Sequence, residues 1–147
     1  MKKTALLFVF FSLFLLSSTL SANERLNFQQ PDSFKENQIS NFIKSQKNAS
    51  DSPYLLAAID LNGDFIDEYI LRPQNSNDCE QAKLCPYYIA AFQDRAPILI
   101  GQFDAHKIVI YNKKTYWIRQ IIVYNDLYND FKTATAIWDP FSFRFKL

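Results

Sequence analysis

The stretch Tyr54 to Pro73, YLLAAIDLNGDFIDEYILRP, decides the fold of this chain. Two short apolar runs, 54–59 and 66–72, flank an acidic turn, and short apolar runs bounded by turn residues are typical of strands. A connection this short joins neighbouring antiparallel strands, because parallel strands need a longer crossover. The stretch therefore predicts an antiparallel hairpin with an acidic loop at its end.

The acidic loop resembles a calcium loop in the spacing of its oxygen-bearing side chains. Short side chains at alternate positions can converge on one hard cation when the backbone curls around it. Counted from the first aspartate, the predicted Ca²⁺ ligands are Asp60, Asn62, Asp64, the carbonyl of Ile66, and Glu68. Leu71 stands at the twelfth place instead of glutamate, which excludes the helix-loop-helix form of such a site.

Phe65 conflicts with the calcium prediction. It stands where such loops usually carry glycine, and a bulky residue held at positive φ would cost about 1–2 kcal/mol. The alternative is a turn held by Asp and Asn side chains that accept hydrogen bonds from backbone N–H groups. The sequence leaves both interpretations open.

The rest of the chain predicts an α+β, mostly β, fold. Ser33 and Glu36 have the spacing of a capping box, and an apolar stripe follows them, so we expect an N-terminal helix at residues 33–46. After Pro53 the pattern becomes extended, and we expect the helix to pack on an antiparallel meander of about seven or eight short strands. The predicted strands are 54–59, 66–72, 86–93, 97–103, 106–111, 118–125, 131–138 and 141–146.

Turns in this fold must rely on Asn and Asp, because the chain has only two glycines, Gly63 and Gly101. Asn112 to Lys114 and Asn125 to Asp130 are the predicted turns. Most aromatic side chains are explained by alternation along a strand with burial of one face. This interpretation applies to Tyr69, Phe92, Phe103, Trp138, Phe143 and Phe145.

Residues 1–22 have the form of a secretory signal peptide. Lys2 and Lys3 precede the apolar run 5–16, and small residues follow it. Without this leader, residues 23–147 are enough for a single β-rich domain with a core of its own. Loss of the two lysines leaves 14 basic and 15 acidic residues of the 16 and 15 in the full chain. This balance predicts no nucleic-acid partner, and no other run is long enough to span a membrane.

The two cysteines, Cys79 and Cys85, predict a disulfide bond, because an exported chain meets an oxidising compartment. A redox site would prefer two residues between the cysteines. A zinc site would need further ligands, which only His106 could begin to supply. We expect the periplasm or the medium as the location.

The run AAIDLNGDFIDEYILRP, followed by a cysteine loop ending in CPYYIAAF, resembles a group of small exported bacterial β-rich domains. The acidic loop, from Asp60 to Glu68, is also similar to the loops of integrin-type and propeller repeats and of periplasmic lysozyme inhibitors. In that group a disulfide loop follows the hairpin, and the chain ends near an aromatic residue and an Asp, here Trp138 and Asp139. The resemblance implies an inhibitor or immunity protein for a secreted cell-wall hydrolase.

The sequence favours a non-enzymatic binding protein over an enzyme, because it contains one histidine and no nucleophile or phosphate motif. Aromatic residues near loop ends predict the contact surface for an envelope or secreted protein: Tyr116, Trp117, Tyr124 and Tyr128. One alternative is an envelope hydrolase working through carboxylate pairs such as Asp67 with Glu68 or Asp126 with Asp130. Another is an accessory or structural subunit of the envelope. Apart from possible Ca²⁺, no cofactor is expected.

Overall fold

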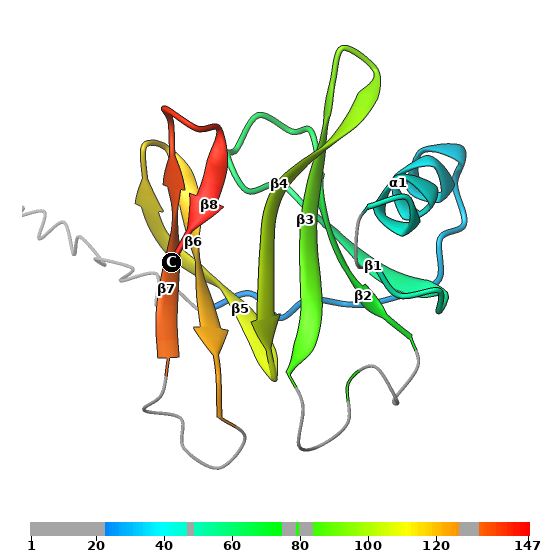
Figure 1. Ribbon diagram of the computed structural model, residues 1–147. Coiled ribbons are helices and arrows are strands. Elements are labelled where there is room, and N and C mark those ends of the chain that lie inside the picture. Colours follow the sequence, from blue (N-terminus) through cyan, green and yellow to red (C-terminus); the bar gives the residue numbers. More distant parts are fainter. Residues whose placement is uncertain (1–22, 47–48, 75–78, 80–83, 127–132) are drawn as a thin grey trace, which may run out of the picture.

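The computed structural model describes residues 23–46, 49–74, 79, 84–126 and 133–147, so the predicted signal peptide lies outside the described residues. Within these ranges the chain forms one helix and eight strands, which confirms the prediction of a mostly β fold (Figure 1). In chain order they are α1 (Phe34–Lys44), β1 (Tyr54–Ile59), β2 (Glu68–Pro73), β3 (Cys85–Gln93), β4 (Ala96–Ala105), β5 (Lys107–Thr115), β6 (Ile118–Tyr124), β7 (Thr133–Asp139) and β8 (Arg144–Lys146).

The strands form two four-stranded antiparallel sheets, with the orders β1-β2-β3-β4 and β5-β6-β7-β8. The prediction of one continuous meander is therefore wrong, although each sheet is a meander by itself. The chain passes from the first sheet to the second at His106, whose backbone N–H donates to the carbonyl of Tyr124 at 2.9 Å. No glycine or proline marks this passage in the sequence.

The helix begins where the capping box predicts. The side chain of Ser33 accepts a hydrogen bond from the N–H of Glu36, and the Glu36 carboxylate accepts one from the N–H of Ser33. The helix is not N-terminal in the fold, because residues 23–33 precede it and pair with strands at two isolated positions. Glu24 bridges to Ile110 of β5 and Gln29 bridges to Leu56 of β1, both in antiparallel fashion.

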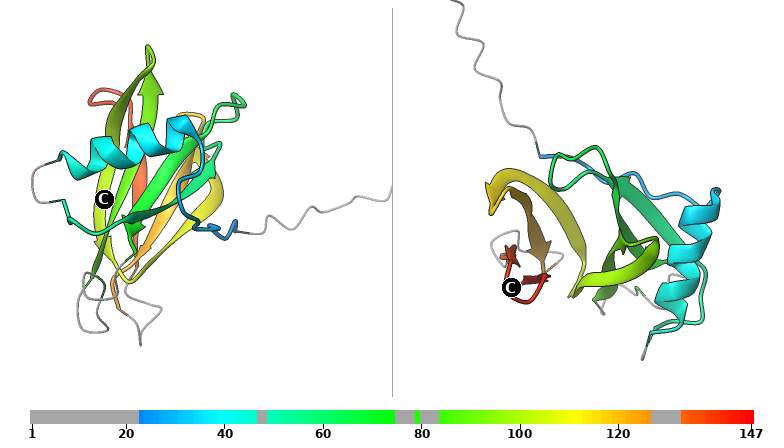
Figure 2. Two further views of the ribbon diagram at one scale, coloured as in Figure 1. Left: turned by 90° about the vertical axis from the view of Figure 1, so that its right-hand side faces the viewer. Right: turned by 90° about the horizontal axis from the view of Figure 1, so that it is seen from above.

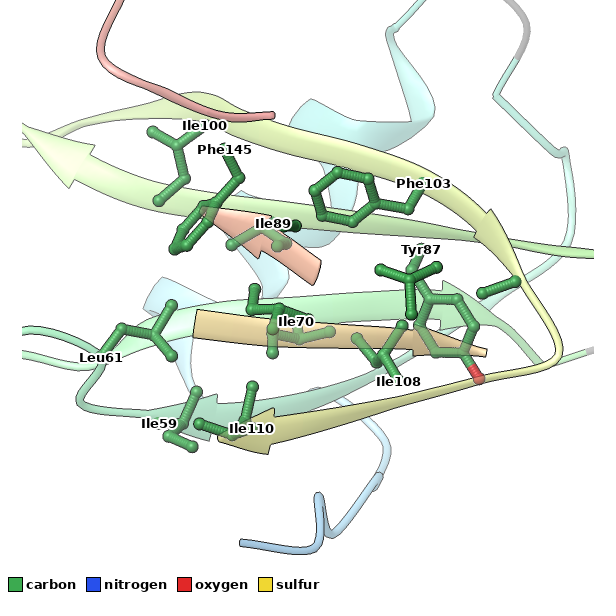
Figure 3. Packing of buried hydrophobic residues seen from close by; sticks show 14 of the residues in the cluster. Ile59, Leu61, Ile70, Tyr87, Ile89, Ile100, Phe103, Ile108, Ile110 and Phe145 are labelled. Carbon is green, nitrogen blue, oxygen red and sulfur yellow. The ribbon is translucent and has the colours of Figure 1, made fainter. Parts of the chain in front are cut away.

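The first sheet lies between α1 on one face and the second sheet on the other (Figure 2). This arrangement makes strands β1 to β3 mostly apolar on both faces. On the helix side, Ile39 and Ile43 of α1 pack with Tyr54, Leu56 and other side chains of the sheet. Between the sheets lies a larger core (Figure 3), which includes Ile59, Ile70, Ile89, Ile100, Phe103, Ile108, Ile110, Ile121 and Phe145.

One aromatic prediction and one turn prediction are corrected by the strand ends. Asn112 to Lys114 lie inside β5 at a register shift, and the turn comes at Tyr116 and Trp117. Phe143 is not buried on a strand, because β8 begins only at Arg144 and Phe143 is exposed in the preceding turn. Residues 125 and 126 of the other predicted turn follow β6, and the rest of it lies outside the described residues. Trp138 is only half-buried.

The antiparallel order places four connections at one end of the two sheets. These are the turns β1–β2, β3–β4, β5–β6 and β7–β8, which point upward in Figure 1. The passage at His106 lies at the opposite end, and so does the start of β3, where Cys85 is bonded to Cys79. The disulfide prediction is confirmed. Among the described residues no helix has both the length and the apolar character to cross a membrane.

Candidate functional site

The four turns at the upper end of the sheets contain every residue with positive φ in the described parts of the chain. The β3–β4 turn has Asp94 (49°) and Arg95 (68°), and the β5–β6 turn has Tyr116 (50°) and Trp117 (69°). Two successive positive φ values define the turn that suits the twist of a hairpin, and Asn-Gly usually supplies it. The other residues of this kind are Gly63, Phe65 and Phe143.

Large aromatic side chains occupy these strained positions and are exposed. Phe65 is 96% exposed, Trp117 85% and Phe143 69%, and each has left-handed backbone. Left-handed backbone costs a residue with a side chain about 1–2 kcal/mol, and exposure of the ring forgoes the gain of burial. We call the exposed aromatic residues at this end the hairpin face: Phe65, Tyr116, Trp117, Phe141 and Phe143.

The β7–β8 turn holds its aromatic residues through one carboxylate. Asp139 accepts hydrogen bonds from the N–H of Phe141 at 3.0 Å and from the hydroxyl of Ser142 at 2.8 Å, and it forms an ion pair with Lys146. These contacts lower the pKa of Asp139 to about 2, the Lys146 ammonium first among them. Phe141 and Phe143 are therefore presented by an ordered turn, not by a loose end.

The acidic loop is ordered by its own side chains. Asp60 accepts from the N–H groups of Gly63 at 2.6 Å and Phe65 at 3.0 Å. Burial is the largest single influence on its pKa and raises it, but the backbone donors of the loop together outweigh burial and lower the pKa. Asn62 accepts from the N–H of Asp64 at 2.8 Å, and its amide donates to the Asp64 carboxylate at 2.9 Å. This is the turn held by Asp and Asn side chains that the sequence offers as an alternative.

The predicted calcium ligands are only partly brought together. Asp60, Asn62 and Asp64 share the loop, whereas the Glu68 carboxylate turns inward and accepts from the N–H of Leu61 at 2.8 Å. Ile66 donates its N–H to Asp64 at 2.8 Å. In the described ranges no three His, Cys, Asp or Glu side chains are grouped so as to hold a metal ion. Calcium binding stays a prediction, which thermal unfolding with and without millimolar Ca²⁺ would test.

The acidic loop of the first sheet is joined to the β5–β6 hairpin of the second. The backbone N–H of Arg119 donates to the carbonyl of Leu61 at 2.9 Å, and the Lys114 ammonium lies 3.5 Å from the carbonyl of Asn62. These contacts set Phe65 and Trp117 on neighbouring turns of the same end. The hairpin face is therefore built by both sheets.

A cavity of about 370 Å³ opens between the sheets beneath the turns. Its wall is mostly apolar, with one buried carboxyl group, that of Glu68, which is 9% exposed. Burial first, and the nearby carboxylates of Asp64 and Asp60 to a smaller extent, raise the pKa of Glu68 to about 7 against the lowering effect of the Leu61 N–H. The residues that line the cavity include Leu61, Glu68, Phe92, Ile98, Ile100, Ile118, Trp138, Phe143 and Phe145.

The predicted contact residues divide between the two ends. Tyr116 and Trp117 lie on the hairpin face, and Tyr116 and Phe141 border a second depression of about 320 Å³. Tyr124 lies at the opposite end of β6, half-buried with the Lys107 ammonium 4.3 Å above its ring, and its role as a contact residue stays a prediction. Tyr128 and Asp130 lie outside the described residues. The exposure of Phe141 and Phe143 was not predicted, because exposure in a turn has no sequence pattern of its own. The cavity was not predicted either.

Comparison of the chain with models of protein families, with curated proteins and with solved structures found no match in any of the three.

Proposed function

We propose that the protein is an exported, non-enzymatic binding protein that contacts another protein through the hairpin face. The observation that carries this proposal is the set of exposed aromatic rings on left-handed backbone at one end of the molecule. Residues held in costly backbone conformations gather at functional sites, and large aromatic residues dominate binding energy at protein interfaces. The disulfide bond supports export, since such bonds persist in oxidising compartments.

We further propose that the partner is a cell-envelope hydrolase and that the protein acts as its inhibitor or immunity protein. The tips of four hairpins project beyond the sheets at one end (Figure 1), a shape that suits insertion into a concave site. The acidic loop is similar to that of periplasmic lysozyme inhibitors, which favours the same partner. The periplasm or the medium is the location that this function requires.

Capture from an extract of exported proteins tests the proposal. The immobilised protein is compared with the double variant Phe65→Ala, Trp117→Ala and with the control Phe34→Ala, which removes an exposed ring from α1. We expect one hydrolase to be retained by the native protein and the control, and its affinity to fall at least about tenfold in the double variant. Retention by the double variant, or inhibition of no captured hydrolase, would contradict the proposal.

The second candidate is a carboxylate-based envelope hydrolase, and one observation favours it. Glu68 is a buried carboxyl group in a cavity, with its pKa raised to about 7, the property that a general acid needs. Turnover of peptidoglycan by the purified protein, abolished by Glu68→Gln or Asp64→Asn, would select this function over binding alone. Turnover that survives both substitutions would exclude these carboxylates as its source.

A further inference from the structure

We propose that the cavity between the two sheets binds a small organic cation, an ammonium group on an aromatic or aliphatic body, with Glu68 as its counter-ion. This inference goes beyond the proposed function, which concerns the exposed hairpin face and a protein partner. It rests on the composition of the cavity wall and on the charges around its one buried carboxylate.

The cavity has the size and wall of a small-molecule site. Its volume of about 370 Å³ lies within the range of 300–1,000 Å³ that is typical of ligand pockets. Ile98, Ile100 and Ile118 from both sheets supply an apolar wall, which would bury the body of a ligand. Such sites combine apolar walls with a few polar groups that fix the orientation of the ligand.

Glu68 is the group that selects the charge of the ligand. It is more than nine-tenths buried, and its carboxylate accepts a hydrogen bond from the N–H of Leu61 and a weaker one from its own N–H. The ion pairs found among the described residues lie elsewhere, between Arg119 and Glu24 and between Lys146 and Asp139. A buried carboxylate is costly unless a positive charge accompanies it, and a bound ammonium group would supply that charge.

The surrounding charges favour a cation over an anion. Asp60 and Asp64 on the acidic loop both act on Glu68 with negative charge. Two cationic residues contact this loop from the second sheet, but through its backbone: Lys114 at the carbonyl of Asn62, and Arg119 by its own N–H at the carbonyl of Leu61. An anionic ligand would meet three carboxylates.

The aromatic side chains of the wall also suit a cation. Trp138 lines the cavity together with Phe143 and Phe145, and its ring packs on both phenyl rings with centroids 6.4 and 5.5 Å away. The face of an indole ring attracts an ammonium group within about 6 Å. Glu68 and Trp138 thus contribute two different attractions for the same kind of group.

Three indole compounds of matched shape test the charge preference. Tryptamine carries an ammonium group, tryptophol a hydroxyl group and indole-3-acetate a carboxylate. At pH 8 we expect tryptamine to bind at least about tenfold more tightly than tryptophol, and indole-3-acetate more weakly than both, measured by calorimetric titration. Equal affinity for the three compounds, or no binding of tryptamine, would overturn the proposal.

Glu68→Gln keeps the shape of the side chain and removes its charge. In this variant the affinity for tryptamine should fall to the affinity for tryptophol. Asp67→Asn, at the exposed neighbouring residue, should leave the affinity for both compounds unchanged. Ile98→Phe, which fills the cavity, should weaken the binding of tryptamine and of tryptophol to a similar extent. Loss of tryptamine binding in Trp117→Ala with full binding in Glu68→Gln would place the ligand on the hairpin face and overturn the inference.

Discussion

Phe65 combines left-handed backbone with a side chain that is almost wholly exposed. Each feature is unfavourable for the isolated molecule, because the first strains the backbone and the second leaves an apolar ring in water. Glycine would remove both disadvantages at this position. A phenylalanine here is consistent with a contribution to binding that the unbound structure does not display.

Phe65→Gly should raise the stability of the protein while weakening its binding. Relief of the left-handed strain is worth about 1–2 kcal/mol, and the greater freedom of glycine in the unfolded chain offsets about 0.5–1 kcal/mol. We therefore expect the free energy of unfolding in urea to rise by about 0.5–1 kcal/mol. Phe65→Ala keeps the strained backbone and serves as the control, with no such gain expected. A loss of stability in the glycine variant would show that the ring packs on the fold.

Glu68 makes the stability of the fold depend on pH. Its pKa is about 7 in the folded protein against an ordinary value of 4.5, so the folded state binds the proton more tightly than the unfolded chain. Its contribution is full below pH 4.5 and is lost as the pH rises through 7. Glu68→Gln removes this loss, and we expect the variant to exceed the native protein by roughly 2–3 kcal/mol at pH 8 and to match it near pH 4.5.

Urea unfolding of the two proteins at pH 4.5, 6 and 8 measures this difference. Asp60 and Asp139 have lowered pKa values and contribute stability that is lost only at more acidic pH, equally in both proteins. Asp67→Asn is the control, because that carboxylate is exposed and next to Glu68 in the chain. Curves for native protein and Glu68→Gln that stay parallel from pH 4.5 to 8 would contradict the pKa of Glu68.

At the scale of the elements, β4 depends on Gly101 for its contact with β8. A β-carbon at this position would lie 3.2 Å from Cδ1 of Ile89 and 3.3 Å from Cβ of Phe145, closer than ordinary contacts. Gly101→Ala should therefore lower the free energy of unfolding by about 1–3 kcal/mol, as overpacking of a core does. Gln102→Ala, at an exposed position of the same strand, should change it by less than about 0.5 kcal/mol.

The elements differ in how far the sequence predicts them. The first strand is predicted with both ends correct, because Pro53 and Asp60 bound an apolar run, and the capping box places the start of α1. The last strand is predicted three residues too early, because Phe141 and Phe143 alternate like strand residues although they form a turn. Alternation alone does not separate an exposed aromatic turn from a buried edge strand.

The β5–β6 hairpin shows why the binding site is harder to predict than the strands. Its central residues, Tyr116 and Trp117, have the backbone that Asn-Gly would favour, so the usual turn signal is missing. The polar residues Asn112 to Lys114 favour a turn in the sequence, but they lie within β5. The sequence predicts Tyr116 and Trp117 as contact residues from their place after a polar run, and this stays a prediction. The position of the turn follows only from strand pairing.

At the scale of the whole molecule, the two sheets explain what the sequence could not reveal about the cavity. Glu68 and Trp138 are separated by 70 positions in the chain, and they line one cavity only because the second sheet packs on the first. A single meander would have placed them on separate parts of one surface. Local patterns predict strands and turns, whereas this site depends on the pairing of sheets, which no local pattern specifies.

If the hairpin face alone contacts the partner, the disulfide bond at the opposite end of the molecule should be dispensable for binding. Cys85 begins β3 at the end opposite the hairpin face, and its bond to Cys79 closes a loop with a sequence separation of 6. Replacing both cysteines by alanine should lower the free energy of unfolding by about 2 kcal/mol, because so short a loop restricts the unfolded chain only modestly. Affinity for the captured partner should change less than about twofold, since the hairpin face and the Asp139 contacts are untouched. Urea unfolding and partner binding are measured for this variant. Lower stability with unchanged affinity would support binding through the hairpin face alone. A loss of both stability and affinity would show that the disulfide end takes part in binding.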